Sequence, residues 1–172
     1  MADFLPAYNF TMDNEDAGRE YKIVPDVGGS AISGINSHSF PGEYAAIAAI
    51  AQHERGLAVE QFYERLFWNQ WLAQLDSQDL ANRVFDAAVN MGPGTAVKLL
   101  QRACNALVGS TAYAIAEDGN WGPQTVKQVN LSDESPLVTA FKNRRIGYYQ
   151  AIVAADPSKA KFLPAWIARA SK

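Results

Sequence analysis

Two carboxylic acids, Glu15 and Asp26, have the type and spacing that acid–base chemistry requires. Glu15 follows an apolar segment that can form a helix, and Asp26 stands just before the pair Gly28-Gly29, which favours a tight turn. A carboxyl group enclosed between a helix end and a hairpin is partly desolvated, which raises its pKa and suits it to act as a general acid. A second, ionised carboxylate can orient water or stabilise an oxocarbenium-like centre. The pair therefore suits glycosidic bond cleavage, with Glu15 as the acid and Asp26 assisting.

The same residues also fit a structural role, because Asp13, Glu15 and Asp16 can form an acidic capping loop and Asp26 can form a turn.

Other types of catalytic chemistry have less support in the sequence. Cys104 is the only cysteine and lies on the apolar stripe of an expected helix, which is typical of a buried structural thiol. No Gly-x-Ser-x-Gly motif occurs, and there are only two histidines. We therefore expect neither a metal nor an organic cofactor.

The elements that position these residues are expected to be mostly helical, with one small β-hairpin near residues 20–36. Apolar residues recur at helical spacing along most of the remaining chain. The predicted helices span 2–13, 42–54, 57–75, 77–91, 96–108, 123–130 and 137–155, followed by a short helix around Trp166. Ser77 is the expected N-cap of the fourth helix, and Gly92-Pro93-Gly94 is expected to end it before Thr95 caps the next. The fold class is thus mainly α.

Composition and charge narrow the class of protein further. The chain has 172 residues, of which 48% are hydrophobic and 19% charged, and this balance excludes an intrinsically disordered chain. Its formal net charge of -3, without a polybasic stretch, argues against nucleic acid as a partner. No apolar run is long enough to span a bilayer, and the first residues lack the pattern of a secretory signal. We expect a monomer made in the cytoplasm, without membrane insertion.

Three segments of the chain resemble glycoside hydrolase family 108 and the peptidoglycan-binding region that follows its catalytic region. The first segment combines Glu15 with Asp26-Val27-Gly28-Gly29 and Gly34-Ile35, as in the active-site pattern of that family. The second is Phe85-Asp86-Ala87-Ala88-Val89-Asn90-Met91-Gly92, ahead of Leu99-Leu100-Gln101. The third is Asp118-Gly119-Asn120-Trp121-Gly122-Pro123-Gln124-Thr125. Together they extend over most of the chain, in the order expected for the family.

The resemblance implies a lysozyme-like helical fold and N-acetylmuramidase activity, which cleaves the β-1,4 bond between N-acetylmuramic acid and N-acetylglucosamine in peptidoglycan. It implies a muramidase region at residues 1–91 and a peptidoglycan-binding region at 92–172, packed as one compact unit. Glu15 would protonate the glycosidic oxygen. The family commonly has a threonine where this chain has Ser30-Ala31-Ile32-Ser33, and Asp16-Ala17-Gly18 follow Glu15 in place of Gly-Gly-Tyr. A lytic transglycosylase and a non-catalytic peptidoglycan-binding module therefore remain alternatives.

Six further residues are candidates for substrate binding. They are Tyr21, Ser33, Trp68, Asp86, Asn90 and Trp121. The aromatic residues among them can stack on sugar rings or pack in a core. Asp86 and Asn90 lie four residues apart on one helix face, where they can bind N-acetyl groups or tie the hairpin to the helix. The pair Arg144-Arg145 is expected on a solvated face.

The expected partner is bacterial peptidoglycan. Since the sequence predicts synthesis in the cytoplasm, the protein would reach the periplasm or cell wall through a holin pore, as a phage endolysin does, or through a secretion system. The sequence leaves the choice between these two routes open.

Overall fold

The structure is a computed structural model that describes residues 1–109 and 114–172, and it confirms the predicted mainly α fold. The helices are α1 (Phe4–Glu15), α2 (Pro41–Ala48), α3 (Gly56–Phe67), α4 (Gln70–Ala73), α5 (Gln78–Met91), α6 (Pro93–Leu107), α7 (Pro123–Leu131), α8 (Glu134–Ala155) and α9 (Leu163–Ser171). Two short 3-10 helices, η1 (Gln52–Glu54) and η3 (Pro157–Phe162), complete the helical content of the described residues. Within these residues, no helix combines the length and apolarity needed to cross a bilayer.

The sheet near the N-terminus is small and antiparallel, with strands β1 (Ile23–Asp26), β2 (Gly29–Ile32) and β3 (Ile35–Asn36) in that order. The sequence predicts one hairpin, and the structure has two tight turns. The first is Val27-Gly28, because Gly29 already pairs with Asp26. The second turn joins β2 to β3 through residues 33 and 34. It is this second turn, rather than the glycine pair, that faces the end of α1.

Helix α5 forms the centre of the molecule, since it contacts α1, α6 and α8. Its apolar residues form one broad face of the helix. Val84 and Phe85 both lie on this face and are fully buried. Met12, Leu100 and Phe141 come from the three neighbouring helices and are also fully buried. Burial of each such side chain contributes about 1.5–3 kcal/mol to folding. This core fixes the C-terminal end of α1, where Glu15 lies.

Helix boundaries differ from the sequence-based expectation at two places where one polar or cyclic side chain decides the outcome. Asn69 interrupts the helix predicted over 57–75, because its side chain accepts hydrogen bonds from the backbone N–H groups of Trp71 and Leu72 and caps a new helix. Pro93 begins α6 directly after Gly92, so the expected cap at Thr95 is wrong. Proline fits the first turn of a helix, where its missing N–H has no intrahelical partner. The predicted N-cap Ser77 is confirmed by its hydrogen bond from the Leu80 N–H.

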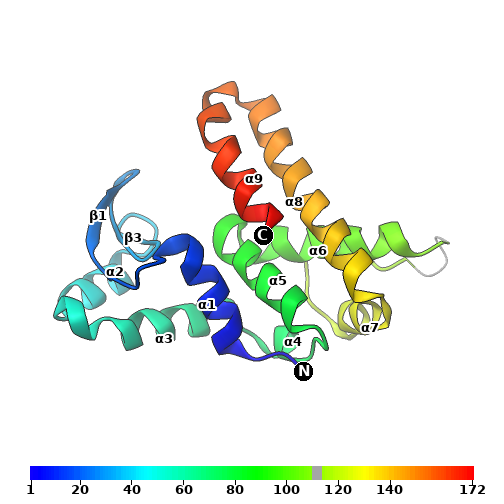
Figure 1. The fold of residues 1–172 in the computed structure, drawn as a ribbon, viewed down its shortest axis with the longest axis horizontal. Helices are drawn as coiled ribbons and strands as arrows, with labels where there is room; N and C mark the ends of the chain where they lie inside the picture. Colours follow the sequence, from blue (N-terminus) through cyan, green and yellow to red (C-terminus); the bar gives the residue numbers. More distant parts are fainter. Residues whose placement is uncertain (110–113) are drawn as a thin grey trace.

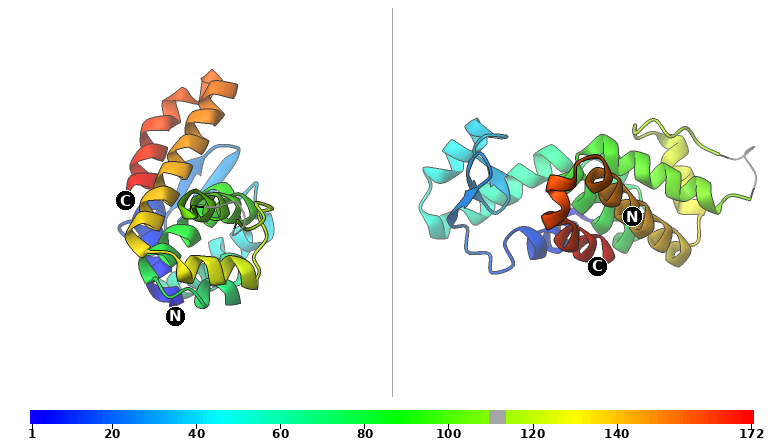
Figure 2. Two further views of the ribbon diagram at one scale, coloured as in Figure 1. Left: turned by 90° about the vertical axis from the view of Figure 1, so that its right-hand side faces the viewer. Right: turned by 90° about the horizontal axis from the view of Figure 1, so that it is seen from above.

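The molecule is elongated, with the sheet, α2 and α3 at one end and α7 with the C-terminal part of α6 at the other (Figures 1 and 2). Helices α8 and α9 are antiparallel neighbours connected by η3, and they project on the same side of the molecule as the sheet (Figure 1). Helix α9 runs back toward the centre, so its C-terminal end lies near α1 and α5 (Figure 1). Residues from the two ends of the chain therefore meet beside the end of α1.

Candidate active site

Glu15 is the last residue of α1, and its side chain is 17% exposed. Its carboxyl group lies against the second turn of the sheet. A Cβ atom added to Gly34 would come within 2.5 Å of Glu15 Oε2 and 2.9 Å of Cδ. Gly34 also has φ +81°, a conformation that L side chains rarely adopt. The turn thus needs glycine at this position for both its backbone geometry and the space that Glu15 occupies.

Tyr63 of α3 supports the same turn from below the carboxyl group. Its hydroxyl donates a hydrogen bond to the Ser33 carbonyl at 2.7 Å, and it would also lie 2.7 Å from a Cβ on Gly34. Burial raises the pKa of Tyr63 well above its usual value, and the negative charge of Glu15 adds to this effect. The phenol therefore stays protonated and acts as a fixed donor that positions the turn beside Glu15.

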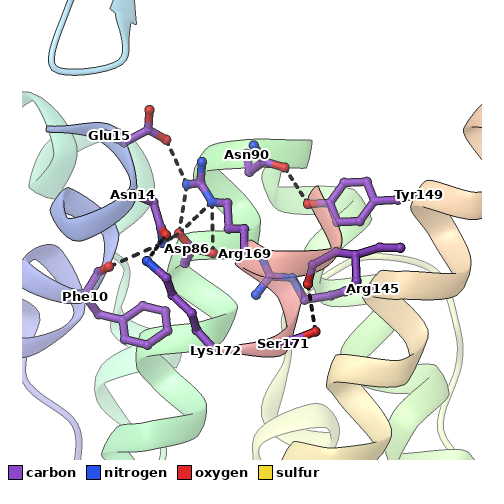
Figure 3. A network of polar contacts seen from close by, with 11 residues as sticks. Phe10, Asn14, Glu15, Asp86, Asn90, Arg145, Tyr149, Arg169, Ser171 and Lys172 are labelled. Atoms are coloured by element: carbon purple, nitrogen blue, oxygen red, sulfur yellow. Dashed lines mark hydrogen bonds and ion pairs between the residues drawn. The ribbon is translucent and has the colours of Figure 1, made fainter. Parts of the chain in front are cut away.

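Arg169 of α9 holds the other side of the carboxyl group (Figure 3). Its Nη2 atom lies 2.8 Å from Glu15 Oε1 and 2.8 Å from Asp86 Oδ1. Its Nε also donates to both Asp86 oxygens, at 3.0 and 3.2 Å. Burial lowers the pKa of Arg169, but the charges of Asp86 and Glu15 outweigh burial and raise it. The guanidinium is thus a permanent cation shared between Glu15 and Asp86.

Asp86 of α5 is completely buried and anchors this network from beneath. Arg145 of α8, 1% exposed, lies 2.7 Å from Asp86 Oδ2, and Asn14 donates to Asp86 Oδ1 at 3.1 Å. A buried carboxylate needs such partners, because an unpaired charge in the interior is very costly. The sequence suggests that Asp86 either binds N-acetyl groups or ties the hairpin to its helix. In the structure its partners are protein side chains, and they link α5 to α8 and α9 rather than to the hairpin. The expectation that Arg145 lies on a solvated face is also wrong, because its guanidinium is buried in an ion pair with Asp86.

Asp26 lies at the opposite end of β2 from the Glu15 contact. It is exposed, pairs with Gly29, and accepts hydrogen bonds from the Val27 N–H at 2.7 Å and from Asn36 Nδ2 at 2.8 Å. The four residue steps from Gly29 to the second turn correspond to roughly 13 Å of extended chain. The structure therefore does not bring Asp26 next to Glu15 but engages it in the turn at the tip of the hairpin.

Asp16, which follows Glu15, is the acidic residue that joins α1 to the sheet. Its carboxylate accepts hydrogen bonds from Ser33 Oγ at 2.7 Å, from the Tyr21 N–H at 2.8 Å and from the Glu20 N–H at 3.0 Å. Partial burial raises the pKa of Asp16, but these hydrogen bonds, led by that of Ser33, lower it overall. Ser33, which belongs to the turn that faces Glu15, thus donates to the carboxylate that organises the loop after α1.

Three of the remaining predicted binding residues belong to different parts of the N-terminal half and make contacts with other protein groups. Tyr21 belongs to the loop after α1, where its carbonyl accepts a hydrogen bond from Arg55. Asn90 accepts a hydrogen bond from the Tyr149 hydroxyl beside the network (Figure 3). Trp68 packs with Phe4 and Phe85, at the other end of α1.

Trp121 lies in the distant half of the molecule, beyond α6. It is half-buried and lines a cavity of about 160 Å³, together with Gln101 and Asp118. Gln101 organises this loop, since its Nε2 donates to Asp118 and its Oε1 accepts from the Gly119 N–H. The sugar-binding roles predicted for the four residues Tyr21, Asn90, Trp68 and Trp121 stay predictions.

Two neighbouring surface cavities lie on the C-terminal half of the chain. A cavity of about 390 Å³ lies between α6, α8 and the loop around Gly119, and Lys98, Arg102 and Tyr148 line it. A neighbouring cavity of about 310 Å³ shares Arg102 and Tyr148 and adds Arg144. Over residues 1–109 and 114–172, no three His, Cys, Asp or Glu side chains gather in a way that could hold a metal ion.

Sequence reasoning missed Arg169 and the contributions of Tyr63 and Asp16. Arg169 stands in the last turn of the last helix, and no spacing along the chain connects it with Glu15. Tyr63 lies on the apolar stripe of α3 and therefore looks like an ordinary core residue. Asp16 was recognised as part of an acidic loop, and only the structure shows that Ser33 is its partner.

Comparison with known proteins matches two families to consecutive parts of the chain. Residues 9–92 match glycosyl hydrolase 108, and residues 95–171 match the predicted peptidoglycan domain family. The structure of Brucella abortus SagA is similar over 98% of this chain and 89% of that chain, with a TM-score of 0.67 and 20% sequence identity. At this identity the similarity concerns the fold, and it supports the expected lysozyme-like helical architecture. A search of curated proteins gave no match.

Proposed function

We propose that this protein is an N-acetylmuramidase with Glu15 as its general acid. The proposal starts from the match of residues 9–92 to glycosyl hydrolase 108, which makes the chain a glycoside hydrolase, and from the match of residues 95–171 to a peptidoglycan domain. The bond cleaved is the β-1,4 linkage between N-acetylmuramic acid and N-acetylglucosamine. The observation that carries this proposal is the enclosure of Glu15 at the end of α1, 17% exposed and in contact with the second turn of the sheet. A carboxyl group held on two sides in this way has a fixed orientation, which suits a directed proton transfer.

The proposed reaction begins with transfer of the Glu15 proton to the glycosidic oxygen. The bond between that oxygen and the anomeric carbon then breaks, the leaving sugar departs as an alcohol, and positive charge develops on the remaining ring. Attack of water on the anomeric carbon, with loss of a proton to a base, completes hydrolysis. Glu15 is left as a carboxylate and regains its proton from solvent.

Asp26 is the residue we propose to assist, through water or through charge stabilisation. A base that activates water on the far side of the sugar stands roughly 6.5–9.5 Å from the acid in inverting enzymes, and a nucleophile in retaining enzymes stands about 5–5.5 Å away. Asp26 stands at the hairpin tip, about 13 Å along the strand from the turn that contacts Glu15. An Asp26→Asn variant measures its contribution directly, and unchanged turnover would remove Asp26 from the mechanism.

The separation of Asp26 from Glu15 favours a second candidate, a lytic transglycosylase. In that reaction a hydroxyl group of the muramic acid itself attacks the anomeric carbon, so one acidic residue suffices and no water is activated. The two reactions differ in their products, because an anhydro-muramyl end is lighter than a hydrolysed end by one water. Mass spectrometry of the released fragments therefore decides between them.

The first test compares wild-type protein with Glu15→Gln on purified peptidoglycan. We expect the variant to lose at least about 10³-fold in turnover, since an amide cannot donate the proton, while it still sediments with intact sacculi. Glu64→Gln serves as the matched control, because Glu64 is an exposed glutamate on α3. Full turnover by Glu15→Gln would refute the assignment of Glu15, whereas loss of turnover in both variants would point to a general effect on folding.

We also propose a division of labour along the chain, with the hydrolase at residues 1–91 and peptidoglycan binding at 92–172. The two family matches, which meet between residues 92 and 95, support this division. The place of action we propose is the peptidoglycan layer, reached from the cytoplasm through a pore, as expected of a phage endolysin, or through a secretion system. Lysis of producing cells only after their inner membrane is permeabilised would support this route, and lysis without permeabilisation would contradict it.

A further inference from the structure

We propose that Arg169, which comes from the C-terminal region, is a positioning residue that orients and strengthens the acid Glu15. This inference rests on the proposed function of Glu15 and extends it. The peptidoglycan domain match includes Arg169, whereas Glu15 belongs to the hydrolase match. The catalytic centre is therefore built from both regions, and the C-terminal region does more than bind the polymer.

The contacts of Arg169 show how its position is fixed. Its guanidinium is 12% exposed and lies between two carboxylates, Glu15 on α1 and Asp86 on α5 (Figure 3). This one side chain makes three contacts with Asp86, two from Nε and one from Nη2. A planar guanidinium held in this way by a buried carboxylate has little freedom to rotate. The second carboxylate contact, to Glu15, is therefore made in a defined direction.

Helix α9 is itself held in place by aromatic packing against α8. The rings of Tyr149 and Trp166 are stacked with centroids 5.2 Å apart, and the rings of Trp166 and Phe162 are stacked at 5.6 Å. Ala170, next to Arg169, is completely buried. The backbone that carries Arg169 is thus packed on one side and its side chain is ion-paired on the other.

The two oxygens of Glu15 have different surroundings, which assigns them different tasks. Oε1 faces the guanidinium of Arg169 at 2.8 Å, and Oε2 faces the turn at Gly34. Because a cation next to Oε1 disfavours a proton there, the transferable proton belongs on Oε2. When the proton moves to the glycosidic oxygen, Arg169 stabilises the carboxylate that remains, so that the acid gives up its proton more readily.

Four groups from four elements surround the Glu15 carboxyl group and set its electrostatics. Arg169 of α9 is the adjacent cation, and Asp86 of α5 is the anion behind that cation. Tyr63 of α3 is a neutral phenol, and Gly34 contributes only backbone. Removal of the guanidinium would leave Glu15 and Asp86 without the cation that lies between them.

The test compares Arg169→Gln and Arg169→Lys with wild-type protein on soluble peptidoglycan oligomers. We expect Arg169→Gln to lower kcat roughly 10–100-fold with KM changed less than about twofold, since ground-state binding is untouched. The pH–rate profile of Arg169→Gln differs from that of wild-type protein, because the charge next to the acid is removed. Arg169→Lys, which keeps the charge, recovers part of kcat and most of the wild-type pH profile. Arg83→Gln on α5 is the matched control, because Arg83 is an ion-paired arginine that is only 10% exposed.

The outcomes separate this inference from the proposed function. If Arg169→Gln is folded by circular dichroism and keeps both kcat and the pH profile of wild-type protein, the positioning role is overturned. If Arg169→Gln does not fold, Arg169→Lys carries the test: a lowered kcat with a nearly unchanged KM supports the positioning role, and an unchanged kcat overturns it. A lowered kcat with the wild-type pH profile in both folded variants overturns it as well. Full activity of Glu15→Gln, by contrast, refutes the proposed function itself.

Discussion

Gly34 is the residue most tightly constrained by the proposed acid. Its φ of +81° and the 2.5 Å approach to Glu15 Oε2 leave no room for a side chain. We expect Gly34→Ala to lower turnover at least about 10-fold, because the added methyl group displaces the carboxyl group or the turn. The backbone strain alone destabilises the fold by about 1 kcal/mol. Turnover on peptidoglycan and urea denaturation measure the two effects.

Gly147→Ala is the control for this prediction, because Gly147 lies within α8 with nothing within 4 Å of an added Cβ. Alanine in a helix interior is favoured over glycine, so this variant should be more stable by up to about 1 kcal/mol, with unchanged turnover. Equal turnover in both variants would show that the contact between Gly34 and Glu15 does not matter for the reaction.

At the scale of residues, the prediction of Glu15 depends on the resemblance of its surroundings to the family's active-site pattern, because its type and its place after an apolar helix also fit a structural role. Arg169 has no such signal, since the fold alone brings the last helix to the end of the first. For Asp26, the sequence correctly predicts the turn but not its location. Asp26 precedes the Gly28-Gly29 pair, and the strand register places this turn at the tip of the hairpin, away from Glu15.

At the scale of elements, the link between α1 and the sheet depends on Asp16 and is predicted to weaken in acid. Hydrogen bonds lower the pKa of Asp16 in the folded protein below its ordinary value of 3.8. The carboxylate therefore contributes stability above that value, and this contribution is lost as the pH falls through the lower folded pKa. We expect Asp16→Asn to be clearly less stable than wild-type protein near about pH 6, and the difference to shrink toward about pH 3.

Urea midpoints of both proteins across this range measure the difference. Asp133→Asn, a change of an exposed carboxylate before α8, is the control, and its effect should stay small at every pH. A difference between wild type and Asp16→Asn that grows toward acid pH would contradict the assigned role of these hydrogen bonds.

The elements themselves were largely predictable, because apolar residues at helical spacing define their buried faces. Their boundaries were less so. Asn69 breaks a continuous apolar pattern through two backbone hydrogen bonds, and Pro93 starts a helix where the sequence suggests a pause. The second turn of the sheet was also missed, since Ser33 adopts a positive φ of 46° that its residue type does not indicate.

At the scale of the whole molecule, Asp86 joins the two halves, so we expect them to unfold together. Asp86→Ala leaves Arg145 and Arg169 without their buried partner and should cost about 3–5 kcal/mol. Fluorescence of single-tryptophan variants that retain Trp68 or Trp166 reports on each half separately. Both should show one common midpoint, shifted equally by Asp86→Ala.

Glu64→Ala on the exposed face of α3 is the control and should shift the midpoint by no more than about 0.5 kcal/mol. Two well-separated transitions in the wild-type protein would show that the halves are independent.

The reach of Arg169 into the neighbourhood of Glu15 limits how this kind of enzyme can be recombined. A chimaera can join this N-terminal half to the C-terminal half of another protein. Such a chimaera keeps the cation next to Glu15 only if the last helix of the other protein places an arginine at the position of Arg169. Engineers who exchange the proposed wall-binding half should therefore transfer that helix contact together with the proposed catalytic half.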